Sequence, residues 1–200
     1  MSANRRPYHQ VARAAAADEL RERILAAFRQ AFLTGWLDDI TLDAVALMAK
    51  TTRRTVIRLF GGKEGLLKAV HDRMTAEIAV RRIVIQGNPG EAVRVLVSDY
   101  EAIGDHVIRM LFQEARWPVL SELLNFGRQW HRDWVTATFG PLIQTTDPAA
   151  RTRRIDQLIA ATDLYTWKLL RRDFERSVEQ TEAIMAGTIR ELLKEGEAEP

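Results

Sequence analysis

Residues 51–60 combine three arginines and three threonines with a short apolar stripe, and they include no acidic side chain. Guanidinium and hydroxyl groups at this density can donate hydrogen bonds to a polyanion such as a nucleic-acid backbone. The wider segment 50–63 holds five basic residues and again no acidic one. These residue types indicate a polyanion contact, and the alternative is an ordinary solvated surface.

The positive charge of the chain is concentrated in its first third. The formal net charge is only +2 over 200 residues. Residues 1–68 contain twelve basic and seven acidic side chains, which gives +5, so residues 69–200 carry −3. A basic element on a nearly neutral protein favours a dedicated polyanion site over general basicity.

Capping residues and helical periodicity predict how this basic segment is held. A long first helix should end near residues 34–35, and Thr41 and Thr52 each stand at an N-cap position before a short helix. The second short helix is predicted over residues 53–59, before two glycines, and a further helix starts at Lys63. Two short helices joined by a tight turn form a helix-turn-helix arrangement.

The apolar stripe of the second short helix predicts which of its side chains face outward. We expect Val56, Ile57 and Phe60 to pack onto the two preceding helices. The arginines would then point to solvent from a helix about 10 Å long, which suits the DNA major groove. The backbone N–H groups that follow Thr52 and Lys63 would point toward phosphates.

This region resembles the DNA-binding domain of tetracycline-repressor-type (TetR-family) transcriptional regulators. The likeness covers residues 24–70, and its most specific string is F-G-x-K-E-x-L-L over residues 60–67. It differs from the usual family pattern at the turn glycine, which is Lys50 here, and at a tyrosine, a histidine and a serine, which are Ile57, Leu59 and Gly62. We expect Lys50 and Arg58 to replace backbone contacts that these changes remove.

The resemblance implies an all-α protein that binds a near-palindromic double-stranded operator as a homodimer. It implies a repressor that a small-molecule effector releases from DNA. The sequence pattern and the resemblance together assign DNA contacts to seven residues: Thr41, Thr52, Arg53, Arg54, Thr55, Arg58 and Lys63. The domains expected are a flexible basic arm at 1–17, the helix-turn-helix domain at 18–68, and a larger helical effector-binding and dimerisation domain at 69–195.

The remainder of the chain also reads as helical. Residues 93–100 fit either a strand or a helix, and the lack of a hairpin turn favours the helix. A turn is predicted at residues 87–90, and helix starts are predicted at Pro118, at Pro148 after an Asp147 cap, and at a Ser177–Gln180 capping box whose helix ends near Lys194.

Four of the five tryptophans lie beyond residue 91, and several aromatic residues share a helix face. Such a stripe is more often core, and the alternative is a largely apolar effector cavity. Our candidates for lining that cavity are Tyr100, Met110, Phe126, Trp130, His131, Trp134 and Trp167. Polar groups could also come from Asp99, His106, Thr162 and Asp163. Wide apolar stripes on the last two helices predict a four-helix dimer interface, or else closure of the chain on itself.

Composition and missing motifs exclude several other classes of protein. The chain has no cysteine, hence no disulfide or thiolate ligand, and no apolar run long enough to span a membrane. It lacks a phosphate-binding loop, a nucleophile elbow and a zinc-protease motif, so we expect neither an enzyme nor a bound cofactor or metal. The expected location is the cytoplasm, without membrane contact. The alternative function is a helical small-molecule-binding protein or enzyme that lacks specific DNA binding.

Overall fold

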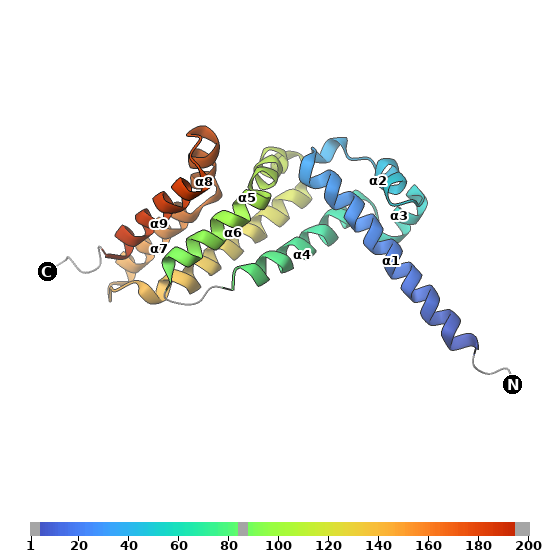
Figure 1. Cartoon of the computed structure of the whole chain (residues 1–200), viewed down its shortest axis with the longest axis horizontal. Coiled ribbons are helices and arrows are strands. Elements are labelled where there is room, and N and C mark those ends of the chain that lie inside the picture. The colour runs from blue at the N-terminus through green and yellow to red at the C-terminus, as the bar shows by residue number, and fades with distance from the viewer. Residues whose placement is uncertain (1–4, 84–87, 195–200) are drawn as a thin grey trace. The chain divides into compact units, whose positions relative to one another are not determined.

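The computed structural model describes residues 5–83 and 88–194, and every regular element in those ranges is a helix. The all-α prediction is therefore confirmed for this part of the chain (Figure 1). The chain forms two compact units, Met1–Thr75 and Ala76–Pro200, and the division falls inside helix α4. Among the described residues, no helix is both long and apolar enough to cross a membrane.

The first unit contains α1 (Arg5–Thr34), a 3-10 turn (Leu37–Asp39), α2 (Leu42–Met48), α3 (Arg53–Phe60) and the start of α4 (Lys63–Arg81). α2 packs against both α1 and α3. The expected end of the first helix and the start at Lys63 are confirmed. α1 begins at Arg5, within the arm expected at residues 1–17, and residues 1–4 lie outside the described ranges.

Local capping explains why two short helices form next to each other. The Thr41 hydroxyl accepts a hydrogen bond from the Ala44 amide at 3.1 Å, and the Thr52 hydroxyl accepts one from the Thr55 amide at 3.3 Å. Both predicted N-caps are confirmed. Gly61 ends α3 in the left-handed region (φ 77°), which a residue without Cβ adopts at little cost.

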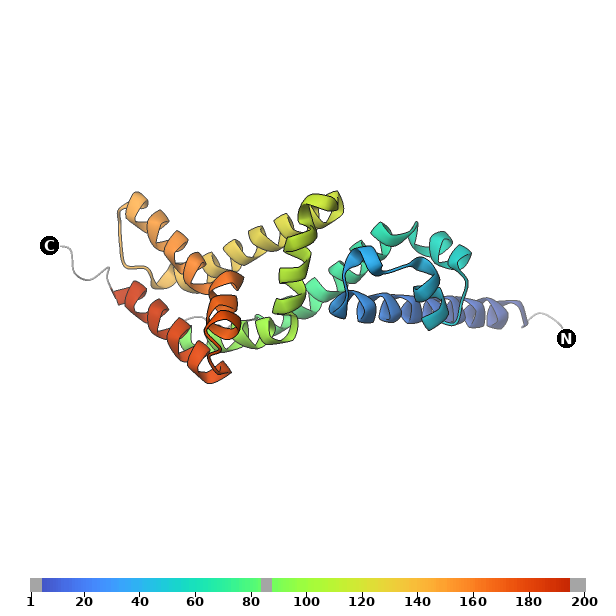
Figure 2. The ribbon, with the colours of Figure 1, turned by 90° about the horizontal axis from the view of Figure 1, so that it is seen from above.

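The second unit contains α5 (Pro89–Gln113), α6 (Pro118–Phe139), α7 (Pro148–Thr162), α8 (Leu164–Lys168), a π-helical turn (Leu169–Asp173) and α9 (Val178–Lys194). Short 3-10 turns, Glu114–Arg116 and Gly140–Leu142, flank α6. α5 packs against α6 and α9, and α7 packs against the same two helices (Figure 2).

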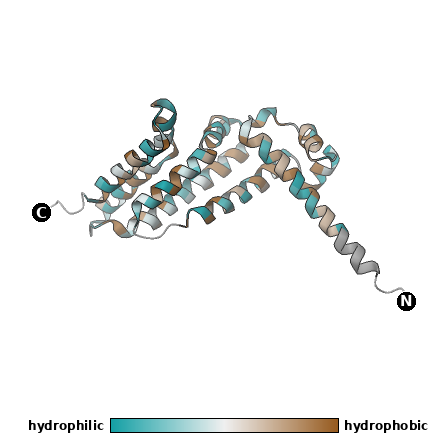
Figure 3. Cartoon of the chain, in the orientation of Figure 1, coloured by the Kyte–Doolittle hydropathy of each residue, from teal (hydrophilic) through white to brown (hydrophobic). Residues whose placement is uncertain are grey.

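The helix predicted over residues 93–100 is confirmed, as are the starts at Pro118 and Pro148 and the Ser177–Gln180 capping box. Asn88 caps α5 and Pro89 is its first residue, so the predicted turn does not include residues 89–90, while Gly87 lies outside the described residues. Polar and apolar residues both occur along the helices of each unit (Figure 3). The largest buried side chain of the second unit, Trp167, lies against Gly104 of α5.

Candidate nucleic-acid interface

Helix α3 presents an exposed cationic face. Arg53, Arg54 and Arg58 are exposed, whereas Val56 is fully buried. Arg53 makes a loose ion pair with Asp43 at 3.9 Å, and both side chains remain largely solvated. Within residues 13–83 and 88–194, whose side chains are described, Arg54 and Arg58 have no ion-pair partner. Two guanidinium groups are thus left available for an external anion.

The expected packing of this helix is wrong for one residue. Ile57 is 43% exposed, whereas Val56 is inaccessible and Phe60 is half-buried. Adjacent residues on an α-helix lie about 100° apart, so the helix cannot turn both Val56 and Ile57 into the same narrow core. Ile57 therefore shares the solvent side with the arginines.

The threonine hydroxyls of the predicted interface are already engaged by the protein. The hydroxyl oxygens of Thr52 and Thr55 lie 3.0 Å apart, within hydrogen-bond distance. The Thr41 and Thr52 hydroxyls also cap α2 and α3. Capping fixes the backbone direction at the start of α2 and α3. These side chains lie at exposed helix N-termini, where the backbone N–H groups favour anions.

Three further basic residues hold the interface in place, and the pattern of the sequence gave no direct signal for two of them. Arg21 donates to the Leu59 carbonyl at 3.2 Å and lies over the Phe60 ring at 4.7 Å. Arg23 donates to the Ala49 carbonyl at 3.4 Å, at the end of α2. Helix C-termini leave carbonyls without intrahelical donors, and these side chains supply them.

Lys63 is the third of these basic residues, although a DNA contact was predicted for it. Its ammonium group donates to the Leu37 carbonyl at 2.9 Å and is partly buried. Burial lowers the pKa of Lys63, against the smaller opposing effect of Asp38 and Asp39. The structure therefore shows Lys63 joining the start of α4 to the turn before α2.

The turn between α2 and α3 has an unusual backbone at Lys50. Its φ is 53°, in the left-handed region that glycine favours. An L-residue there costs about 1 kcal/mol relative to glycine. The conformation turns the chain directly from α2 into the Thr52 cap, and the Lys50 side chain stays exposed.

The second unit contains a buried ionic cluster at the end of α4. Arg81 and Arg82 each donate through Nε to one oxygen of Asp99, both at 2.7 Å. The Arg82 and Asp99 side chains are only 5% and 2% exposed. The Arg82 guanidinium lies 5.1 to 5.5 Å from three aromatic ring centroids, which belong to Tyr100, Trp130 and Trp134. Pairing and cation–π contacts offset the loss of hydration of both charges.

His131 lies at the edge of this cluster and stays neutral. The Thr162 hydroxyl donates to the Leu158 carbonyl at 2.7 Å, so it accepts from His131 Nε2, 3.1 Å away. This assignment leaves Nδ1 as a buried acceptor, and the described residues offer it no hydrogen-bond partner. Burial, followed by the charge of Arg82, lowers the pKa of His131 to about 4.

The predicted effector residues do not all lie together. Tyr100, Met110, Trp134 and Trp167 are buried, and Trp167 donates its indole N–H to Glu101 at 2.8 Å. Phe126 is 51% exposed and does not belong to this core, because it falls on the solvent side of α6. Asp163 instead caps α8, where it accepts from the Tyr165 amide at 2.8 Å.

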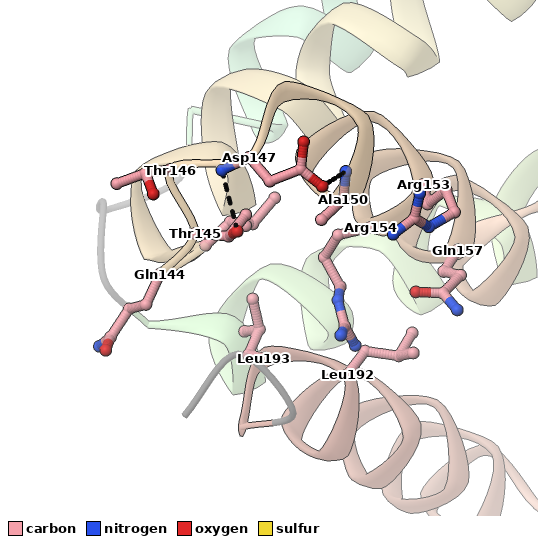
Figure 4. A pocket seen from close by; sticks show the side chains of 11 residues that line it. Gln144, Thr145, Thr146, Asp147, Ala150, Arg153, Arg154, Gln157, Leu192 and Leu193 are labelled. Atoms are coloured by element: carbon pink, nitrogen blue, oxygen red, sulfur yellow. Dashed lines mark hydrogen bonds between the residues drawn. The ribbon is translucent and has the colours of Figure 1, made fainter. Parts of the chain in front are cut away.

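A groove of about 690 Å³ opens elsewhere in the second unit, between the start of α7 and the end of α9. Figure 4 shows Arg153, Arg154 and Gln157 on the α7 side and Leu192 and Leu193 on the α9 side. None of the seven predicted effector residues lines it. The groove could not be predicted from the sequence, because its lining residues are polar and apolar and come from distant segments.

Most apolar side chains of α7 and α9 pack inside the second unit and are not available for a dimer interface. Leu158, Met185 and Ile189 belong to the buried core, and Leu192 and Leu193 pack against it. Ile184 on α9 is an exception and is 43% exposed.

Two solved structures have this arrangement of helices. A transcriptional regulator from Rhodococcus sp. Rha1 matches with a TM-score of 0.64 at 21% identity, over 90% of this chain and 98% of that one. A TetR-family transcriptional regulator from Streptomyces coelicolor matches with a TM-score of 0.61 at 20% identity, over 89% and 96% of the two chains. The chain has the fold of a TetR-family regulator. No protein-family model and no curated protein matches its sequence.

The turn between the two capped short helices has Lys50 in a left-handed conformation, and α3 carries the exposed Ile57 among its arginines. These are two of the positions at which the sequence differs from the TetR-family pattern that it resembles.

Proposed function

We propose that the protein is a sequence-specific DNA-binding transcriptional regulator that acts as a homodimeric repressor. The observation that carries this proposal is the exposed cationic face of α3, held by the Thr52 cap and by Arg21, in the fold of known regulators. Arg53, Arg54 and Arg58 would meet bases or phosphates in the major groove. Thr41, Thr52, Thr55 and the backbone N–H groups near Lys63 would approach the sugar-phosphate backbone.

The short length of α3 is the reason for proposing a dimer. One helix of eight residues, as α3 is, touches few base pairs, whereas two copies about 34 Å apart read a near-palindrome. The exposed Ile184 on α9 supports an interface formed by α7 and α9 of two protomers.

We place effector recognition in the second unit, where the partly buried Trp130 joins the buried residues Arg82, Tyr100, His131 and Trp134. Its aromatic faces and the free acceptor on His131 would suit a largely apolar compound with a hydrogen-bond donor. The effector would release DNA to the extent that it prefers a conformation with misplaced recognition helices.

Selection of bound duplexes from a random library, followed by gel-shift titration at several salt concentrations, tests the DNA-binding proposal. We expect a near-palindromic motif and an affinity that falls steeply with salt. Arg58→Ala should weaken binding and lower the salt slope by about one per protomer if Arg58 meets a phosphate. Salt-insensitive binding, or none, together with tight small-molecule binding would instead favour the alternative of a helical binding protein or enzyme.

Repeating the operator titration with a broad compound library tests the effector. A compound that releases DNA from the wild type and loses potency against Trp130→Ala would support the proposed cluster. Retained potency against that variant, with loss of potency against Arg153→Ala, would move the effector site to the groove.

A further inference from the structure

Ile57 is the apolar member of a face that is otherwise cationic. It follows Arg53 by one helical turn and precedes Arg58 directly, and all three side chains are exposed. Residues four apart lie on the same side of a helix, so Ile57 and Arg53 point in similar directions. The neighbouring Val56, and not Ile57, packs into the core.

A single exposed aliphatic residue is ordinary on a protein surface, but its position here narrows what it can contact. Guanidinium groups on the same helix disfavour an apolar protein partner and favour a polyanion. The helix is also fixed in place, because Thr52 caps its start and Arg21 holds the carbonyl of Leu59 near its end. A rigid, cationic helix that carries one branched aliphatic group thus needs a partner that combines phosphates with an apolar group.

The DNA major groove offers this combination. Guanine presents acceptors that pair with arginine, and thymine presents a 5-methyl group that aliphatic side chains contact. We infer that Ile57 contacts the 5-methyl group of a thymine in each operator half-site and thereby specifies thymine at that position. This inference rests on the proposed function, since it requires α3 to enter the major groove.

The test uses the full chain and the duplex obtained by selection. Each thymine is replaced in turn by deoxyuridine, which removes only the methyl group and keeps base pairing. We expect one position per half-site where the replacement raises the Kd about three- to fivefold, the factor that burial of one methyl group gives. Ile57→Ala should bind more weakly than the wild type and should show no further loss at that position.

Two variants serve as controls. Leu47→Ala removes another exposed apolar side chain, 80% accessible on α2, and should keep the wild-type sensitivity to deoxyuridine. Ile57→Val retains a branched side chain and should keep part of the sensitivity. Because Ile57 is 43% exposed, thermal unfolding of both Ile57 variants should stay close to that of the wild type.

The outcomes separate the inference from the function on which it rests. If selection yields no preferred sequence, the proposed function fails and the inference fails with it. If a specific operator emerges but no thymine is sensitive, or if Ile57→Ala remains as sensitive as the wild type, the inference is overturned and the regulator remains.

Discussion

At the scale of single residues, the buried polar groups of the second unit make the strongest demands on stability. His131 is neutral in the folded protein, since its pKa is lowered to about 4, whereas an unfolded histidine titrates near 6.5. Between these values the unfolded state binds more protons than the folded state. Stability is therefore fully present above pH 6.5 and falls as the pH drops toward 4.

Because the unfolded state protonates His131 and the folded state does not, we expect the free energy of unfolding to fall by about 2 kcal/mol when the pH is lowered from 7.5 to 5.0. Urea unfolding of the wild type and of His131→Gln at both values measures this contribution, because the variant should lose most of the dependence. His71 also has a pKa lowered by burial, so His71→Gln is the necessary comparison. Identical pH dependence in the wild type and His131→Gln would contradict the assignment.

Asp99 is the second residue on which the unit depends. Asp99→Asn leaves Arg82 buried without its counter-charge, and loss of one partner of a buried pair costs about 3 to 5 kcal/mol. Chemical unfolding followed by circular dichroism would show the loss. Asp156→Asn breaks an exposed pair with Arg132 at 3.4 Å and should change little. Equal effects of the two substitutions would show that the cluster is solvated.

At the scale of the elements, close packing between α5 and α8 depends on Gly104. A Cβ at this position would approach the Trp167 ring to 2.5 Å, and that ring is fully buried. Gly104→Ala should thus destabilise the protein by about 1 to 3 kcal/mol, despite the better helix propensity of alanine.

Gly127→Ala on α6 is the matched control for this prediction. No atom lies within 4 Å of a Cβ built there, so alanine should stabilise the helix by about 0.5 to 1 kcal/mol. The two substitutions are chemically identical and should shift the melting temperature in opposite directions. An increase in melting temperature for both variants would mean that Trp167 moves aside without cost.

The elements also show which parts of the fold could be predicted from the sequence. Helix starts depend on a few neighbouring residues, so the caps at Thr41, Thr52, Asp147 and Ser177 could be recognised directly. The rotation of an eight-residue helix depends on a fraction of a turn, and for this reason Ile57 was placed on the wrong side. The short α8 and the π-helical turn after it have no clear periodicity.

Contacts between distant segments could not be predicted. Arg82 and Asp99 are separated by 17 positions and by the residues that join α4 to α5, and their pairing depends on how those helices cross. The same is true of Lys63, whose contact with Leu37 spans 26 positions. The sequence singles out Asp99, Tyr100 and His131 as candidates for the effector site, but it does not reveal the cation near which they lie.

At the scale of the whole molecule, the proposed dimer depends on apolar surface that the chain does not cover itself. Ile184→Asp introduces a charge on the exposed side of α9, where the folded monomer should tolerate it. We expect a shift from dimer to monomer in analytical ultracentrifugation and a large loss of operator affinity. An unchanged dimer would exclude this part of α9 from the interface, and a monomeric wild type would exclude the dimer.

The three aromatic rings around Arg82 provide the protein with a built-in optical reporter. Two of these rings are the indoles of Trp130 and Trp134, and the second also stacks on the His131 ring at 5.9 Å between centroids. Indole emission responds to the position of a nearby cation and to local polarity. Any compound that displaces the guanidinium would change the intrinsic fluorescence, so unlabelled protein can be screened for ligands of this cluster before an operator is known.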